Sequence, residues 1–443
     1  MVDKLGDWGL GNRKWGDLYI GILLVIFGGI VLHAPLTVWL SSNFPDCGLF
    51  IKSWKEILML VASFIATYLL YKYKKFKILR NPLILTIIAY AVLHFVLLFI
   101  NNQGLMPSLA GLIIDLRYLL FFVLVCVAIQ LFPDKKDLFL KVGIAGALIV
   151  VIFAILQVFV LPKDFLSVLG YGENTIAPYL TVDQNQDFIR INSTLRGPNP
   201  LGAYALIVLA LAFSVFVNKK TKKSLAVFLI LVFGSLTALW FSYSRSAMLG
   251  FAITLSIIFL VKFFNKLSIK NWLTIGAVFV IGVGGLFAMR NTDFISHIVL
   301  HENPSEGNNE NSNEGHINSL TDSLQEVVSK PLGTGIGSTG SASLLGDEPV
   351  VVESQYLMVA HETGWLGLAY LLAIYGLILW QLWNNKKDWL SLGVFASGVG
   401  LAVIGLFLPV FADDTVSIIW WGLAGMVIGD WGLGNRKWGL RNG

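Results

Sequence analysis

Charged side chains are scarce in this sequence. Asp, Glu, Lys and Arg make up 13% of its 443 residues, well below the roughly 25% that is usual in soluble domains. Hydrophobic residues make up 56%, and the mean hydropathy is +0.73. This composition excludes a soluble globular protein, and the chain is therefore predicted to be an integral membrane protein.

Cysteine is nearly absent as well. The chain has two, Cys47 in a short connecting segment and Cys126 in the middle of an apolar run. Cysteines so placed exclude a disulfide framework, and no cluster of His, Asp and Glu has the spacing of a metal site. We therefore expect neither a metal nor another cofactor.

Long apolar runs fill most of the chain. A membrane-spanning helix needs about 20 apolar residues, and without water the backbone must be helical. About twelve runs meet this length, at residues 18–40, 54–71, 82–100, 108–132, 138–161, 200–217, 224–243, 246–264, 271–289, 356–383, 390–411 and 414–428. The sequence predicts an all-α polytopic membrane protein with a single transmembrane domain, residues 18–428.

Lys and Arg are concentrated in alternate connecting segments, such as 72–80, 135–141 and 219–223. Cytoplasmic loops retain these residues during insertion. We therefore expect both terminal segments, 1–17 and 429–443, to be cytoplasmic. The same bias explains the pI of about 9.0, so no nucleic-acid partner is needed.

The two terminal segments share an identical stretch. GDWGLGNRKWG occurs at residues 6–16 and again at 429–439. One interpretation is a duplicated terminal segment without a role of its own. The other is an interfacial anchor, with Trp at the headgroup level and Arg-Lys toward anionic lipid. Neither copy is expected to be catalytic.

Two segments on the extracytoplasmic side, 162–199 and 290–355, are too long to be simple connections. Within the second, HENPSEGNNENSNEG (301–315) is almost free of apolar residues. The following stretch, 316–331, has apolar residues at helical spacing and ends in Pro331, which predicts a helix. The Gly-rich turn PLGTGIGSTGS comes next and lacks the GK[ST] sequence of a nucleotide-binding loop.

Three arginines lie in or beside apolar runs, where arginine is costly. Arg196 lies in STLRGPNPLGAY before a span, Arg245 in the short hairpin FSYSRSAMLG, and Arg117 within GLIIDLRYLLFF. Guanidinium groups suit bidentate contact with phosphate. Structural roles are the alternative: Arg245 could reach lipid headgroups, and Arg117 could pair with an acid on a neighbouring helix.

In order, STLRGPNPLGAY, SYSRSAMLG, a long outer loop, KPLGTGIG and ESQYLMVAHETGWLGL resemble the O-antigen ligase and O-antigen polymerase superfamily. The resemblance implies a membrane-embedded, GT-C-like glycosyltransferase of the bacterial cytoplasmic membrane, metal-independent and inverting. Its donor would be a glycan on undecaprenyl diphosphate, and its acceptor a glycan or lipid-linked glycan. Arg196 and Arg245 match the positions that hold the diphosphate in that family.

The resemblance fails at the general base. Ligases have His-Asn or His-Ser where this chain has Glu353-Ser354, and Gly-Arg where it has Gly315-His316. A carboxylate in an apolar setting can accept a hydroxyl proton, so Glu353 is one candidate base. His316 is the other, and as a cation it could instead bind phosphate.

Glu353 and Glu362 are nine residues apart, which on a continuous helix places them on opposite faces and ~13 Å apart along the axis. They are therefore not expected to act as the carboxylate pair of a glycosidase. We expect Glu362 to pair with Arg117 or Arg245 as a supporting residue. His361 is expected to be structural.

A polymerase and a ligase would share all these residues, and the missing ligase histidine favours polymerisation slightly. The alternative from another class is a transporter or flippase of lipid-linked glycans or small solutes. Transporters often have related halves, whereas the loops of this chain are very unequal in length.

Overall fold

The computed structural model describes residues 6–182, 185–218, 225–264, 312–347 and 349–430, which are mostly helical. The helices are α1 (Gly6–Gly29), α2 (His33–Asn43), α3 (Gly48–Lys52), α4 (Trp54–Lys72), α5 (Pro82–Ile100), α6 (Leu105–Leu131), α7 (Lys136–Phe159), α8 (Pro198–Asn218), α9 (Leu225–Phe241), α10 (Arg245–Phe263), α12 (Ser312–Ser329), α13 (Gly340–Ser343), α14 (Gln355–Asn384), α15 (Trp389–Ile404) and α16 (Asp414–Asp430).

The described helices include eight segments long and apolar enough to cross a membrane, and α9 and α15 are shorter apolar helices. The chain is therefore a polytopic membrane protein, as predicted. The expected span at 271–289 lies outside the described residues, and the total of about twelve spans stays a prediction.

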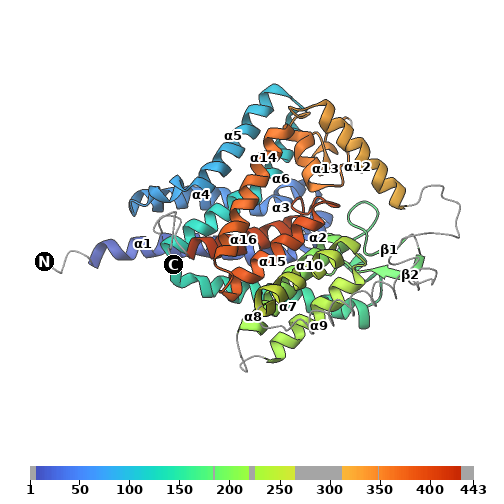
Figure 1. Cartoon of the computed structure of the whole chain (residues 1–443), viewed down its shortest axis with the longest axis horizontal. Helices are drawn as coiled ribbons and strands as arrows, with labels where there is room; N and C mark the ends of the chain where they lie inside the picture. The colour runs from blue at the N-terminus through green and yellow to red at the C-terminus, as the bar shows by residue number, and fades with distance from the viewer. Residues whose placement is uncertain (1–5, 183–184, 219–224, 265–311, 348, 431–443) are drawn as a thin grey trace.

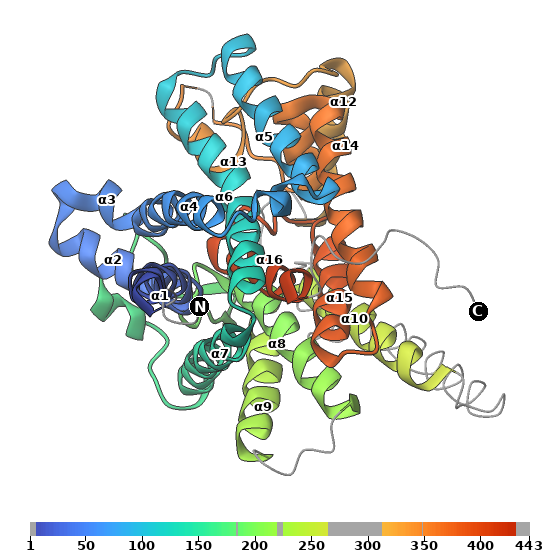
Figure 2. The ribbon, with the colours of Figure 1, turned by 90° about the vertical axis from the view of Figure 1, so that its left-hand side faces the viewer.

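Helix α16 lies at the centre of the bundle. Figure 2, in which α1 is seen nearly end-on, shows α16 between α6, α8 and α15. A Cβ atom at Gly425 would lie 2.9 Å from the carbonyl oxygen of Phe122, and one at Gly429 would lie 2.9 Å from that of Cys126. Glycines four residues apart let two membrane helices approach closely, and α16 packs along α6 in this way.

Helices α8 and α10 run side by side in the same direction, and α15 runs against them. Near the start of α8, Gly202 packs against Ala247. A Cβ atom added at Gly202 would lie only 2.8 Å from the Cβ of Ala247. Near the other end of α8, the Ser214 hydroxyl donates to the carbonyl of Trp389, the first residue of α15 (2.6 Å). Helices α8, α10, α14 and α16 thus begin at one end of the bundle, which we call the loop end.

The loop end also carries a small sheet that the all-α prediction did not include. Strands β1 (Leu180–Val182) and β2 (Asn185–Arg190) are antiparallel, with Leu180 opposite Arg190. They lie within the predicted loop 162–199. Figure 1 shows them on the right, opposite the start of α1 on the left.

The second long loop contains the predicted helix. Helix α12 covers Ser312–Ser329, close to the expected 316–331, and Pro331 follows it. Figure 1 shows α12 and α13 beside α14 at the upper right. This part of the loop packs against the membrane helices α14 and α6.

The expectation of a continuous helix over 356–383 is wrong at one position. Gly364 interrupts α14 with φ +68° and ψ −172°. A Cβ atom there would lie 2.3 Å from the carbonyl oxygen of Pro331, and the N–H of Trp365 donates to that same carbonyl (3.1 Å). The Gly-rich turn after Pro331 therefore crosses α14 at the kink.

Candidate functional site

Arg196 and Arg245 lie at the N-terminal ends of two neighbouring helices, at the loop end. Arg196 is exposed just before α8, and Arg245, half-buried, is the first residue of α10. Residues 242–244 connect α9 to α10, which confirms the predicted short hairpin. Gly202 in α8 packs against the side chain of Ser244. The two arginine-bearing turns therefore lie next to each other.

A third arginine, which the sequence did not single out, ties these turns together. The Nε–H of Arg190 on β2 donates to the carbonyl of Ser242 (2.8 Å), and its Nη2 donates to Oδ1 of Asn199 (2.7 Å). Ser242 is three residues before Arg245, and Asn199 is three residues after Arg196. Arg190 thus fixes the relative position of the two predicted diphosphate-binding turns.

Glu353 lies just before α14 and is half-buried. The N–H of Gln355 donates to the carbonyl of Gly405 (2.9 Å), and its side-chain oxygen accepts from the N–H of Phe411 (2.8 Å). The segment that carries Glu353 is therefore fixed against residues 405–413, the turn between α15 and α16. Because Glu353 precedes α14, the helical spacing that the sequence analysis assumed between Glu353 and Glu362 does not apply.

The far end of the same turn carries Asp413, whose side chain is half-buried. Burial raises the pKa of Asp413, and the positive charges of Arg196 and Arg117 act in the opposite direction. Arg196 is thus within Coulomb range of this carboxyl group. The turn 405–413 thus contacts the segment of Glu353 and carries a carboxyl group on which Arg196 acts electrostatically.

Arg117 belongs to a buried charge network that supports this turn. It pairs with Asp414, the first residue of α16, and the Nζ of Lys55 lies 2.8 Å from Oδ2 of that carboxylate. The Nε2 of His33 lies 3.1 Å from the same oxygen. The side chains of Lys55 and Arg117 are only 3% and 7% exposed. Arg117 has an acidic partner on a neighbouring helix, and the expected pairing with Glu362 is wrong.

Glu362 is buried against the Gly-rich turn and a second carboxyl group. Its Oε1 accepts from the N–H of Thr339 (3.3 Å), and the nearby Asp115 carboxyl group acts on it electrostatically. In the part of the chain that the structure describes, no arginine contacts Glu362, so the expected pairing with Arg245 is wrong too.

His361 connects the loop helix α12 to α14. Its Nε2 lies 3.1 Å from Oε2 of Glu326, and its Nδ1 lies 2.9 Å from the Thr334 hydroxyl and 3.2 Å from that of Ser338. Lys330 donates to Glu326 (2.8 Å), and this hydrogen bond is the main cause that lowers the pKa of Glu326. These contacts agree with the expected structural role of His361.

The second candidate base cannot be placed at the site. His316 belongs to α12, but its side chain lies outside the described residues. Among the residues that are described, no group of three or more His, Cys, Asp or Glu side chains is arranged to hold a metal ion. The chemical roles of Glu353 and His316 stay predictions.

Residues 230–372 match the family model described as O-antigen ligase. The matched segment contains Arg245, Glu353 and Glu362, and it begins after Arg196. The predicted resemblance is confirmed for this part of the chain, which carries an O-antigen ligase domain. Its family implies glycosyltransferase-type activity in polysaccharide assembly, on lipid-linked glycans and acceptors in a membrane. A search of curated proteins gave no match to the chain.

Proposed function

We propose that this chain, with its O-antigen ligase domain at residues 230–372, is a metal-independent inverting glycosyltransferase of the bacterial inner membrane. It would transfer a glycan from undecaprenyl diphosphate to a hydroxyl group of a glycan or lipid-glycan acceptor. The loop end would face the extracytoplasmic side, with both termini in the cytoplasm. The connections at the opposite end support this orientation, because they carry basic residues such as Lys72, Lys77, Lys135 and Lys387.

One observation carries the proposal: Arg196 and Arg245 stand at the starts of adjacent parallel helices, and Arg190 joins their turns. The N-termini of α8 and α10 add partial positive charge at the same place. Guanidinium groups match phosphate oxygens in geometry. This is the arrangement that a diphosphate requires, and it lies beside the segment of Glu353.

In the proposed reaction, Glu353 or His316 accepts the proton of the acceptor hydroxyl. The alkoxide oxygen attacks the anomeric carbon of the donor sugar from the side opposite the diphosphate, so the configuration inverts. The bond from that carbon to the diphosphate oxygen breaks, and undecaprenyl diphosphate leaves with the electron pair. Arg196 and Arg245 stabilise the developing negative charge, which in this mechanism takes the place of a bound metal cation.

The proposal favours polymerisation of a lipid-linked repeat slightly over ligation of a finished chain, because Glu353 replaces the histidine of ligases. Deleting the gene distinguishes the two. Loss of a polymerase leaves short single-repeat glycans, whereas loss of a ligase leaves long lipid-linked chains that never reach their acceptor. A flippase, the alternative from another class, would instead leave lipid-linked glycan in the inner leaflet.

The proposal is tested by Arg196→Ala and Glu353→Gln in cells that lack the native gene. Each variant should reach normal membrane levels and fail to restore surface glycan. Arg80→Ala is a matched control, because Arg80 lies in the connection between α4 and α5 at the other end of the bundle. Wild-type glycan with both Arg196→Ala and Glu353→Gln would refute the assignment.

A further inference from the structure

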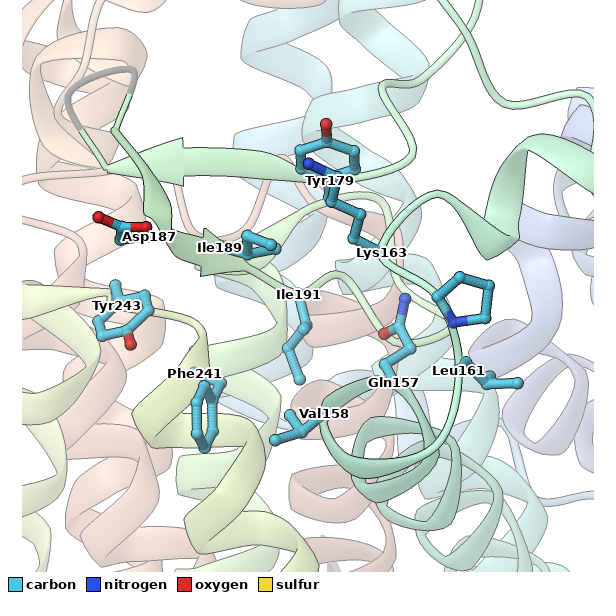
Figure 3. A pocket seen from close by; sticks show the side chains of 11 residues that line it. Gln157, Val158, Leu161, Lys163, Tyr179, Asp187, Ile189, Ile191, Phe241 and Tyr243 are labelled. Carbon is cyan, nitrogen blue, oxygen red and sulfur yellow. The ribbon is translucent and has the colours of Figure 1, made fainter.

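A cavity of about 350 Å³ opens between the end of α7, the β-hairpin and the connection from α9 to α10. Its volume is within the range of about 300–1,000 Å³ found for small-molecule sites. The lining includes the exposed side chains of Lys163 and Asp187 and half-buried apolar ones such as Val158, all of which Figure 3 shows. None of the site residues predicted from the sequence lines this cavity.

One face of β2 forms a wall of this cavity. Asp187 and Ile189 line it, as expected of alternate residues on a strand, and Ile191 follows just after the strand ends. Arg190, between two of them, instead reaches Ser242 and so holds the arginine-bearing turn. The strand therefore has the cavity on one face. On the other face it carries Arg190, which holds the turns of the proposed diphosphate site.

The lining combines aromatic rings with charged groups. Tyr179 and Tyr243 contribute rings, Asp187 a carboxylate, and Lys163 an ammonium group whose Nζ lies 5.4 Å from the centre of the Tyr179 ring. Tyr243 has φ +46°, which is uncommon for a bulky residue. Its ring is held between those of Phe188 and Phe241. Such strain persists only where the surroundings enforce it, so the position of this ring is fixed.

The composition of this lining indicates which kind of ligand fits the cavity: an acyl chain, a phosphate group or a sugar ring. An acyl chain would offer no hydrogen-bond partner to the Asp187 carboxylate, and covering a charged group in this way is costly. A phosphate group would be repelled by Asp187. A sugar ring presents C–H groups to aromatic faces and hydroxyl groups to a carboxylate and an ammonium group, and it therefore fits both parts of the lining.

We propose that this cavity binds a sugar ring of the glycan substrate. Tyr243 lines the cavity, and Arg245 begins α10 two residues later, so the sugar site and the proposed diphosphate site share one turn. A glycan that occupies the cavity would have another part of its chain beside the arginines. The inference rests on the proposed function for its choice of glycan, but its binding chemistry can be tested separately.

The test uses the purified full-length chain and two pocket variants, Tyr179→Ala and Asp187→Asn. The probe for binding is the free oligosaccharide repeat, released by mild acid from the surface glycan of the same cells and observed by saturation-transfer NMR. Each pocket variant should weaken this binding by roughly tenfold, the effect of one lost hydrogen bond or ring contact. Glu173→Gln, an exposed residue of the same loop, is the control and should bind as the wild type does.

The second readout is transfer from a polyprenyl-diphosphate-linked repeat. The pocket variants should raise one KM by roughly tenfold with little change in kcat: the donor KM if the cavity holds the donor sugar, and the acceptor KM if it holds the acceptor. Arg245→Ala should lose transfer yet bind the free oligosaccharide normally. A wild-type protein that binds the oligosaccharide but transfers nothing would refute the proposed function and leave the sugar site standing. Pocket variants that match the wild type in both readouts would overturn the sugar site.

Discussion

The Nε2 of His361 lies 3.1 Å from Oε2 of Glu326, and this contact fastens the loop helix α12 to the membrane helix α14. On its other side, the imidazole meets the hydroxyl groups of Thr334 and Ser338 in the Gly-rich turn. One buried side chain thus joins three separate segments of the O-antigen ligase domain. How firmly the loop helix is held depends on the charge of Glu326.

The attachment of α12 should weaken in acid. The hydrogen bond from Lys330 is the main cause that lowers the pKa of Glu326 below its ordinary value of 4.5, and the contact with His361 of α14 lowers it further. A carboxylate with a depressed pKa contributes stability that is present above the ordinary value and is lost as the pH falls through the lowered one. Amide hydrogen exchange in α12 should therefore stay slow from neutral pH down to about 4.5 and rise below it, after correction for the intrinsic rate.

Glu326→Gln removes this charge at neutral pH. It should increase exchange in α12 at pH 7 and abolish the additional rise in acid. Asp322→Asn on the same helix, whose side chain is exposed, is the control. An acid-induced rise of the same size in the Glu326→Gln protein would contradict the assignment to Glu326.

Asp414 holds two buried cations, and its removal should be strongly destabilising. Asp414→Asn removes the carboxylate nearer to Lys55 and Arg117. The carboxylate of Glu56 remains, with Oε1 3.1 Å from Nζ of Lys55 and 3.8 Å from Nη1 of Arg117. Breaking a buried ion pair from one side costs about 3–5 kcal/mol, which should lower the melting temperature of the detergent-solubilised protein by several degrees. Asp134→Asn, at a side chain that is 74% exposed, should leave the melting temperature unchanged. Equal melting temperatures for the two variants would contradict the network.

Glu362 should tolerate glutamine but not alanine. The oxygen of a glutamine can accept from the N–H of Thr339, as Oε1 of Glu362 does. Glu362→Ala leaves this N–H group buried without its acceptor, at about 1–3 kcal/mol. Thermal unfolding should thus show a near-native Glu362→Gln protein and a clearly destabilised Glu362→Ala protein. Equal stability of the two would show that Glu362 does not hold the turn.

Glycine is required at position 337. Gly337 has φ +83°, and a Cβ atom there would lie 2.1 Å from the carbonyl oxygen of Pro107. Gly337→Ala should therefore cost about 3 kcal/mol in strain and displacement. The matched control is Gly376→Ala in α14, where a Cβ atom meets nothing within 4 Å and the better helix propensity of alanine is mildly favourable. Similar thermal stability of the two variants would show that the Gly-rich turn is not packed as described.

Features that depend on local sequence were predictable. Apolar runs of membrane-spanning length located most of the helices, and helical spacing ending at Pro331 located α12. The short hairpin that carries Arg245 followed from the lack of room between two apolar runs. Each of these signals is contained in one continuous stretch of chain.

Partners distant in sequence were not predictable. Arg190 looked like an ordinary loop residue, and its contacts to Asn199 and Ser242 arise only when β2 folds against two helix starts. The partner of Arg117 was expected on another helix but could not be chosen, because several acids satisfy the same requirement. The kink at Gly364 also depends on a distant segment, the carbonyl of Pro331.

The central claim is that Arg196 and Arg245 jointly hold the diphosphate of a lipid-linked donor. Its most direct test is single-turnover transfer by the purified protein from a polyprenyl-diphosphate-linked glycan, with Arg196→Ala, Arg245→Ala and the double variant compared with Arg80→Ala. The account predicts a loss in rate of roughly 10²–10³ for each single variant, a smaller further loss in the double variant because the two act on one group, and no loss for Arg80→Ala. Wild-type rates in both single variants, with the proteins folded, would contradict it.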